Sequence, residues 1–443
     1  PYKQQVSSLL RLGLPIVVGQ LGMIILGLAD TIMIGHHSTE ELAAAAFVNN
    51  VFNLAIIFAT GFSYGLTPLI GMLQGGGNTQ GIGRVFRNAL AANASVAVLL
   101  TAVMYTVYCF VDKLGQPEEL LPHIRPYFVL QLISLLFIML FNGFRQFAEG
   151  LTDTRTPMWI LLGGNALNIF GNYLLIYGSF GFPEWGLFGA GVSTLVSRIV
   201  MLLVFIGVVA VARRYKVYRE AILRSRFNRN DFMQLNALGW PIALQMGMET
   251  AAFSLSAIMV GWLGSIPLAA HQIMISVSTI GFMVYYGMGA ALAVRVSHFM
   301  GQKDFPNLRR AVNSGMGIIL SLAIVASLFF YLARTPIIYS FTEDHEVMIV
   351  VSSLIFSLIV YQFGDALQIT FANALRGTTD VKPMMWIAFF SYFIVALPVG
   401  YLCGFTWGGG VVGVWVAFPA GLFTAGFLFW LRFRYRLKQL MKK

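Results

Sequence analysis

The feature that most limits how this chain can fold is a series of twelve long apolar runs. A hydrocarbon core about 30 Å thick is crossed by ~20 residues of helix. Open strands would leave backbone groups unpaired in lipid, so runs of this length indicate helices. The expected spans cover residues 9–34, 43–72, 85–111, 121–150, 155–178, 187–212, 235–262, 267–300, 308–332, 346–376, 380–404 and 409–433.

The composition agrees with a membrane protein and excludes two other classes. Hydrophobic residues make up 58% of the 443 positions and charged residues only 11%, whereas a water-soluble domain carries about 25% charged residues. An ordinary soluble enzyme and a disordered chain are both excluded. The two cysteines, Cys109 and Cys403, lie in separate apolar runs, so no disulfide framework is expected.

The distribution of basic residues predicts how the chain is oriented. Lys and Arg favour the cytoplasmic side of a membrane. With the N-terminus inside, the inner connections collect most of them, especially 213–229 and 432–443, while the outer connections hold only Lys113, Arg125 and Arg334. We therefore expect both termini in the cytoplasm. The formal net charge of +11 is interpreted as a topology signal, and no nucleic acid partner is expected.

The sequence also contains an internal repeat. Gly13-Leu14-Pro15-Ile16 recurs as Gly239-Trp240-Pro241-Ile242, and Met158-Trp159-Ile160 recurs at nearly the same offset as Met385-Trp386-Ile387. Each repeat holds six spans, so both halves enter the membrane from the same side. We predict an all-α polytopic membrane protein with twelve transmembrane helices, in two six-helix bundles related by a pseudo-two-fold axis along the membrane normal. The expected domains are an N-lobe of residues 1–212, a basic cytoplasmic linker of residues 213–232 and a C-lobe of residues 233–443.

Three acidic residues, Asp30, Glu249 and Asp365, stand inside the expected spans, while the other acids lie in connections or at helix ends. A carboxylate at the centre of a membrane costs several kcal/mol, roughly 2.5–3.5 on insertion scales. None of the three aligns with an acid in the other repeat, so the duplicated scaffold does not require them. We interpret them as functional, with a structural hydrogen bond or ion pair as the alternative.

Further polar side chains share helix faces with these acids. Gln245 and Ser256 lie on the stripe of Glu249, and Tyr361 and Gln368 lie on that of Asp365. Carboxylate, amide and hydroxyl oxygens suit small hard cations, and an apolar setting favours reversible protonation of a carboxylate. A candidate cation site in the first half consists of Asp30, Asn168, Asn172 and Thr194. For the asparagines, hydrogen bonding between helices is the alternative.

Other polar residues are given structural roles. Arg198 lies deep in the sixth span, where we expect it to snorkel or to pair with helix carbonyls rather than to contact a substrate. All six histidines lie at helix ends or in connections, and His271 is read as a helix-packing residue. No nucleophile–base pair or metal set is evident, so the protein is not expected to be an enzyme. The Gly75–Gly77 run lacks the Gly-Lys-Ser/Thr ending of a phosphate loop, which leaves no ATPase signal.

Several motifs together resemble the multidrug and toxic compound extrusion (MATE) family. They are Ala29-Asp30-Thr31-Ile32-Met33-Ile34-Gly35, Ala269-Ala270-His271-Gln272, Tyr361-Gln362-x-x-Asp365 and Leu375-Arg376-Gly377. The similarity spans essentially the whole chain. Glu249 and Asp365 in the second half resemble the NorM-type branch rather than the DinF-type branch.

The resemblance implies an antiporter of the bacterial inner membrane that exports amphipathic organic cations in exchange for Na⁺ or H⁺. Glu249, Tyr361 and Asp365 match the cation-coupling positions of the C-lobe, and the Asp30 group matches those of the N-lobe. Asn172 stands where DinF-type members have an acid. The Na⁺ candidates are Asp30, Asn168, Asn172 and Asp365, and the candidates for the substrate cleft are Gln245, Ser256, Gln368 and Gln272. No cofactor beyond the coupling ion is expected, and the protein is expected to act as a monomer.

The alternative function is a flippase for lipid-linked precursors, since the wider superfamily includes exporters of lipid-linked glycans. A cleft for such substrates would be lined with basic residues that meet their phosphates. Only Arg198 lies in mid-membrane, which argues against this alternative.

Overall fold

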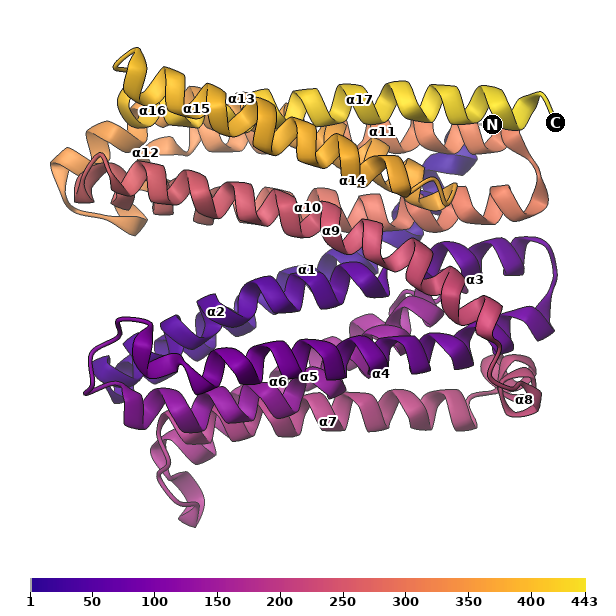
Figure 1. Cartoon of the computed structure of the whole chain (residues 1–443), viewed down its shortest axis with the longest axis horizontal. Helices are drawn as coiled ribbons and strands as arrows, with labels where there is room; N and C mark the ends of the chain where they lie inside the picture. Colours follow the sequence, from indigo (N-terminus) through magenta and orange to yellow (C-terminus); the bar gives the residue numbers. More distant parts are fainter. Residues whose placement is uncertain (1) are drawn as a thin grey trace. The chain divides into compact units, whose positions relative to one another are not determined.

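The computed structural model describes residues 2–443, and in this range it contains helices and no strand. Twelve helical segments of the described range are long and apolar enough to cross a membrane, which confirms the all-α fold and the number of spans expected from the sequence. Figure 1 shows their course along the chain.

The spans begin and end within several residues of the apolar runs. In chain order they are α1 (Tyr2–His37), α2 with α3 (Thr39–Ser63, Leu66–Gly75), α4 (Thr79–Cys109), α5 (Leu121–Gly150), α6 (Arg155–Tyr177), α7 (Leu187–Val211), α9 (Arg229–Gly261), α10 (Ser265–Gln302), α11 (Phe305–Leu332), α13 (His345–Gly377), α14 to η5 (Lys382–Phe389, Phe390–Ala396, Leu397–Tyr401, Leu402–Thr406) and α16 with α17 (Gly410–Trp415, Ala417–Met441). Short helices lie in the connections: η1 (Val111–Lys113), η2 (Ser179–Gly181), η3 (Arg213–Tyr215), α8 (Lys216–Arg224) and α12 (Arg334–Phe341).

The helices pack as two compact units. The N-unit is Val18–Ala243, and the C-unit combines the start of α1, up to Val17, with Leu244–Lys443. Helices α1 and α9 therefore each belong to both units. Each changes unit two residues after an internal proline, Pro15 or Pro241. Since proline removes one helical hydrogen bond and bends a helix, both changes occur where the helix is weakest.

These packing units differ from the expected lobes at the start of α1 and in the region of the linker. Residues 213–232 hold η3, α8 and the first turn of α9, and all of them pack with the N-unit. A Cβ on Gly83 of α4 would lie 2.6 Å from the Cβ of Ala221 in α8, so this close approach requires glycine. The Arg84 Nε donates to Asp231 Oδ2 at 2.6 Å. The basic segment is thus folded against the N-unit.

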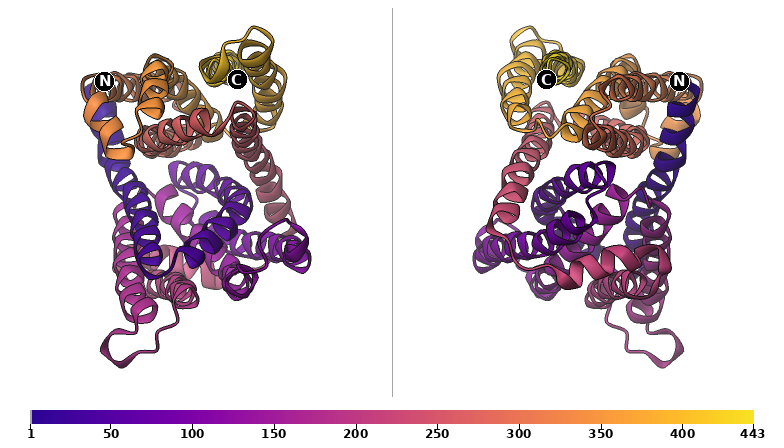
Figure 2. Two further views of the ribbon diagram at one scale, coloured as in Figure 1. Left: turned by 90° about the vertical axis from the view of Figure 1, so that its left-hand side faces the viewer. Right: turned by 90° about the vertical axis from the view of Figure 1, so that its right-hand side faces the viewer.

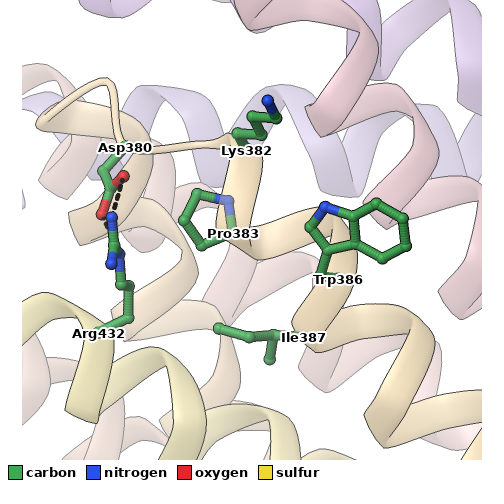
Figure 3. Close-up of a pocket in the computed structure, with 6 residues that line it drawn as sticks. All are labelled: Asp380, Lys382, Pro383, Trp386, Ile387 and Arg432. Atoms are coloured by element: carbon green, nitrogen blue, oxygen red, sulfur yellow. Dashed lines mark hydrogen bonds and ion pairs between the residues drawn. The ribbon is translucent and has the colours of Figure 1, made fainter.

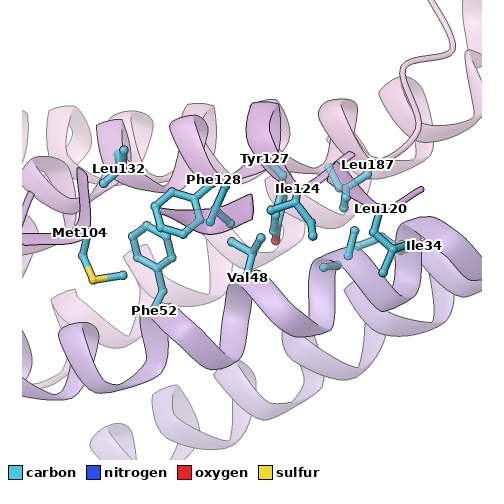
Figure 4. Packing of buried hydrophobic residues seen from close by; sticks show 14 of the residues in the cluster. Ile34, Val48, Phe52, Met104, Leu120, Ile124, Tyr127, Phe128, Leu132 and Leu187 are labelled. Carbon is cyan, nitrogen blue, oxygen red and sulfur yellow. The ribbon is translucent and has the colours of Figure 1, made fainter. Parts of the chain in front are cut away.

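A hydrophobic core fixes the part of the N-unit that carries Asp30. Phe52 of α2 and Phe128 of α5 meet edge to face with ring centroids 4.7 Å apart, and Val48 and Ile124 are fully buried beside them (Figure 4). Ile34, one turn after Asp30, belongs to the same core. Close packing of this kind holds a helix in one rotation about its axis, so the direction of the Asp30 side chain is set by its neighbours.

The internal repeat reappears as matching local structure in the two units. Asn78 caps α4 by accepting the backbone N–H of Gly81 at 3.0 Å, and Asp304, its counterpart in the second repeat, caps α11 through Asn307 at 3.3 Å. Thr152 and Thr379 are likewise counterparts, and both adopt left-handed backbone conformations with φ of 69° and 61°. The duplicated sequence therefore builds the same turns twice.

The two units differ at their peripheries. Figure 2 shows the helices of each unit end-on, with the α6–α7 connection projecting from the N-unit. The base of this connection is held by His37, whose Nε2 lies 2.9 Å from Glu184 and whose Nδ1 lies 2.7 Å from Glu41. In the C-unit, the first turns of α1 and the end of α17 lie at the same end (Figure 1).

Candidate functional site

The C-unit contains a pair of acids between α9 and α13. Asp365 on α13 is 1% exposed, and no donor among residues 2–443 lies within hydrogen-bond distance of either carboxylate oxygen. Glu249 on α9 is half-buried and close enough for the two charges to interact. Burying a charge without a partner costs several kcal/mol. Asp365 therefore requires a proton or a cation.

Amide side chains bridge the same two helices. The Gln368 Nε2 donates to Glu249 Oε2 at 3.3 Å, and the Arg376 Nη2 donates to Gln245 Oε1 at 3.0 Å. Gln245 and Glu249 are one turn apart on α9, so the two contacts form consecutive links between the helices. The guanidinium of Arg376 also interacts electrostatically with Glu249. Glu249 thus has an internal countercharge, whereas Asp365 has only a second acid.

Tyrosine side chains complete the polar cluster of the C-unit. The charges of Asp365 and Glu249 both act on the buried phenols of Tyr361 and Tyr392. Tyr392 lies in η4, a π-helical segment, whereas the repeat counterpart of this span, α6, is a regular α-helix. Single π-helical turns often mark functional sites because they rotate side chains out of the regular α-helical positions. Tyr392 therefore joins the acids by a local departure from the duplicated pattern.

Aromatic rings surround this cluster. The rings of Phe253 and Phe418 stack 4.9 Å apart, and those of Trp415 and Phe418 meet at 4.8 Å. His271 is buried and accepts the Trp415 Nε1–H at 3.0 Å, in keeping with a packing role. A cavity of about 10 Å³ lies beside Ser256 and Tyr392, which is room for about one water molecule. The surroundings offer aromatic faces to a small cation.

The N-unit brings the four predicted residues of its cation site onto neighbouring helices. The Asn172 side-chain amide on α6 donates to the carboxylate of Asp30 on α1. The Asn168 Nδ2 donates to Thr194 Oγ1 on α7 at 3.4 Å, and the neighbouring Ser193 donates to the Asn168 carbonyl at 2.8 Å. These hydrogen bonds link α1 to α6 through the carboxylate of Asp30, and α6 to α7 through amide and hydroxyl groups. Ser193 was not found from the sequence, since a single serine in an apolar span carries no distinctive signal.

Arg198 supplies positive charge to the N-unit cluster. Its Nη1 donates to Ser134 Oγ at 2.5 Å and to Gln131 Oε1 at 3.2 Å, both on α5. It also interacts electrostatically with Asp30 and Tyr127. Arg198 pairs with side chains rather than with helix carbonyls, because α5 presents two oxygen acceptors at its level.

A second buried charge pair lies on α5 of the N-unit. The Arg145 Nε donates to Glu149 Oε1 at 3.0 Å, and both side chains are less than a tenth exposed. Arg145 and Arg198 line a cavity of about 160 Å³, together with the polar side chains of Gln20, Thr60, Tyr64 and Asn142. The remaining lining is apolar, with Met23, Ile56, Ile138, Phe141, Leu161 and Met201, so this cavity has a mixed polar and apolar wall.

The candidates for the substrate cleft have different environments in the structure. Gln245 and Gln368 are buried in the C-unit network, and Ser256 is buried beside Tyr392. Gln272 is exposed on α10. Among the described residues, no group of three or more His, Cys, Asp or Glu side chains is placed to hold a metal ion. A cation would instead meet one or two carboxylates with amide and hydroxyl oxygens.

Comparisons of the whole chain identify its relatives. The sequence profile of the MatE family matches residues 15–174 and 241–402, one match in each repeat. The multidrug resistance protein NorM of Photobacterium profundum is 30% identical over 448 residues, which cover 98% of this chain and 96% of that protein. This agrees with the expected resemblance to the NorM-type branch.

Solved structures share the fold. An outward-facing multidrug resistance MATE family transporter of the MOP superfamily has a TM-score of 0.90 at 21% identity and covers 99% of this chain and 97% of its own. A MATE transporter of Vibrio cholerae has a TM-score of 0.89 at 18% identity, with 100% and 99% covered. The eukaryotic MATE transporter AtDTX14 has a TM-score of 0.87 at 16% identity, with the same coverage. The chain is therefore a multi-pass membrane protein that belongs to the MATE family of multidrug transporters.

Proposed function

We propose that the protein is a secondary antiporter that exports amphipathic organic cations across a bacterial inner membrane, in exchange for inward Na⁺ or H⁺. We further propose that both termini face the cytoplasm, as the distribution of Lys and Arg predicts. Membership of the family and the multidrug resistance assigned to its NorM relative support export of small molecules.

One observation carries the proposal: Asp365 is buried with both carboxylate oxygens lacking a protein partner. An isolated buried carboxylate is unstable unless it is neutralised. A coupling ion or a cationic drug can each supply that neutralisation, and the two then compete for one group. Competition for a single negative charge is the simplest basis for exchange.

The residues around Asp365 are assigned separate roles in binding the coupling ion and the drug. Asp365 binds the coupling ion, and Glu249 forms the second carboxylate of the site. The positive charge of the nearby Arg376 partly balances the negative charge of Glu249. Tyr361 and Gln368 offer further oxygens at the level of the acids. The rings of Phe253, Trp415 and Phe418 suit flat organic cations. Exchange then requires only that each cation binds the two conformations of the transporter with different affinity.

The cluster of Asp30, Asn168, Asn172 and Thr194 is proposed as a second cation site in the N-unit. Its amide and hydroxyl oxygens suit Na⁺, while its single carboxylate also suits a proton. Asp30 already has a hydrogen-bond donor in Asn172 and a positive neighbour in Arg198. We therefore assign it a supporting role and assign the main coupling to Asp365.

Ethidium efflux from membrane vesicles tests the proposal. Wild-type vesicles are given an imposed Na⁺ gradient and then an imposed pH gradient, and efflux is expected with at least one of them. Asp365→Asn should abolish efflux while the protein still reaches the membrane. Asp344→Asn, an acid-to-amide change at the exposed cap of the same helix α13, serves as the control and should retain full efflux.

Two results would overturn the assignment. Full efflux in the Asp365→Asn variant would remove Asp365 from the coupling site. Wild-type efflux that responds to neither gradient would contradict antiport itself.

A further inference from the structure

The C-unit carries an open groove outside both polar clusters. It has a volume of about 510 Å³ and lies between the start of α14 and the middle of α17. Figure 3 shows the Asp380–Arg432 pair on one side and the Trp386 ring on the other, with Pro383 and Ile387 between them and Lys382 at the rim. The groove thus combines charged groups with an apolar wall.

The groove contains two basic residues, Lys382 and Arg432, and one acid, Asp380. The Arg432 Nε and Nη2 donate to the two oxygens of Asp380 at 2.7 and 3.1 Å. This pairing uses one edge of the guanidinium and leaves Nη1 available. Lys382 is exposed, and within residues 2–443 it makes no hydrogen bond or ion pair. An anionic group in the groove would therefore meet one free ammonium and one free guanidinium edge.

The apolar wall faces outward from the unit. Trp386 is 62% exposed although it is a large hydrophobic side chain, and tryptophan is enriched where a membrane meets water. The neighbouring Ile387 and Pro383 continue this wall. A phosphate beside an extended apolar surface is the chemistry of a phospholipid, whose head group and chains lie at the same boundary.

In the N-unit, the acid that corresponds to Asp380 has partners that Asp380 lacks. Asp153, the counterpart of Asp380, accepts the Tyr215 hydroxyl at 2.6 Å and the Arg214 Nε at 3.2 Å, both from η3. In the C-unit, α17 continues as one helix through Arg432 to Met441. Among the described residues, none outside α17 donates a hydrogen bond to the side chain of Asp380. Arg155 and Trp159, the counterparts of Lys382 and Trp386, are exposed as well. The two units therefore differ here in the partners of the acid: η3 binds Asp153, whereas Asp380 is paired, within residues 2–443, by Arg432 alone.

We propose that this groove binds the phosphate of an anionic phospholipid. Lys382 and the free edge of Arg432 hold the phosphate, and Trp386 and Ile387 pack along the glycerol and the upper part of an acyl chain. Basic pockets between transmembrane helices bind anionic head groups in this manner. The inference is independent of the transported substrate and of the coupling ion.

Lipid retention by the purified full-length protein tests the site. Detergent-solubilised protein is incubated with dioleoylphosphatidylglycerol, and the bound lipid is counted by native mass spectrometry. Lys382→Gln should lower the affinity for this lipid about fivefold, the loss expected for one basic residue near the head group. Arg155→Gln changes the repeat-equivalent residue in the N-unit, which is also exposed but lies beside an acid that η3 already pairs, and should alter the affinity less than about twofold.

Two further ligands distinguish a lipid from a free anion. Dioleoylphosphatidylcholine has the same chains without net charge and should bind more weakly than the glycerol lipid. Inorganic phosphate, measured by thermal shift, should stabilise the protein much less than the lipid does. Trp386→Ala should weaken lipid binding without changing the response to phosphate.

The proposal is overturned by any of four results. Unchanged lipid binding in Lys382→Gln would remove the groove as the site. An equal loss in Arg155→Gln would mean attraction to basic surface in general. Equal binding of the neutral lipid, or equal stabilisation by phosphate, would exclude an anionic phospholipid as the specific ligand.

Discussion

Two intramembrane acids that look alike in the sequence have opposite environments. Asp30 in the N-unit receives a hydrogen bond from Asn172 and lies near the positive charge of Arg198. Asp365 in the C-unit has no donor within the described residues, and its charged neighbour is another acid, Glu249. The N-unit gives its acid a hydrogen-bond donor and a positive neighbour, whereas the C-unit leaves an acid that only an added proton or cation can compensate.

The same contrast recurs at one position of the repeat. Glu149 in the N-unit and Arg376 in the C-unit are repeat counterparts and carry opposite charges. Glu149 pairs with Arg145 one turn earlier on its own helix, while Arg376 reaches across to Gln245 on α9. The two repeats have kept the same backbone scaffold, but their charged residues have diverged. The buried charges are therefore arranged differently in the two units.

The sharpest test of this contrast compares Asp30→Asn with Asp365→Asn in the same ethidium assay. Asp365→Asn should abolish export, a loss of more than about tenfold, because it removes the uncompensated charge. Asp30→Asn should leave about a third of the wild-type rate, since the amide oxygen still accepts the Asn172 hydrogen bond. Equal losses in the two variants, at equal protein levels, would show that the two acids share one role.

The next largest effect is expected for the buried pair of the N-unit. Glu149→Ala leaves the Arg145 charge without its carboxylate and should destabilise the protein by about 3–5 kcal/mol. Arg376→Ala in the C-unit removes a hydrogen bond to Gln245 and the countercharge of Glu249. Because Glu249 is only half-buried, this change should cost less, about 1–3 kcal/mol. Thermal unfolding in detergent measures both. As a control, the double variant Arg145→Met with Glu149→Met should recover most of the loss, because no charge is left buried; failure to recover would contradict this account.

Two glycines test whether the scaffold is equivalent in the two units. A Cβ on Gly150 would lie 2.8 Å from Ile70 Cβ, and one on Gly377 would lie 2.7 Å from Val296 Cβ. Both neighbours are β-branched and cannot turn aside, so Gly150→Ala and Gly377→Ala should each cost about 1–3 kcal/mol. Gly163→Ala, where nothing lies within 4 Å, is the control. A large difference between the destabilisations caused by the two substitutions would mean that one unit accommodates an added methyl group more easily than the other.

A smaller, pH-dependent effect is expected at Asp153. Burial raises the pKa of Asp153, but hydrogen bonds from Tyr215 and Thr156 and the charge of Arg214 together hold it below its ordinary value of 3.8. The carboxylate therefore stabilises the folded protein fully above that value, and the contribution is lost as the pH falls through the lower folded-state pKa. Asp153→Asn should cost about 1–2 kcal/mol at neutral pH.

The matching change in the C-unit provides the comparison for Asp153. Asp380 has only Arg432 as its side-chain partner within residues 2–443, so Asp380→Asn should cost less than Asp153→Asn. Unfolding temperatures measured from neutral pH down to acid should converge for Asp153→Asn and wild type. A difference that stays constant down to acid pH would contradict a contribution from the ionised carboxylate.

Much of the fold followed from local sequence. Run length and hydropathy predicted the twelve spans, because the bilayer sets one length for all of them. The packing units did not follow, because the crossing of α1 and α9 depends on which neighbours the helix meets beyond Pro15 and Pro241. Apolar periodicity says that a helix is buried, but not in which unit.

The site was predictable where a regular α-helix carries it. Gln245 and Gln368 were found because residues spaced by three or four share a face with the acids. Tyr392 was not found, because the π-helical turn η4 breaks that spacing. The link from Arg376 to Gln245 was also missed, since pairing between helices depends on their relative rotation. Gln272 lies exposed on α10, and its place in a substrate cleft stays a prediction.

The sharing of α1 and α9 has a consequence for biosynthesis. The N-unit is one continuous stretch and is complete once the first part of α9 has left the ribosome. The C-unit instead joins the start of α1 to Leu244–Lys443, so the first turns of α1 must wait for the helices after Leu244 before their packing partners exist. A chain cut between α7 and α9 would place a segment of each unit on the wrong fragment. Both fragments must then be inserted together for either unit to be completed.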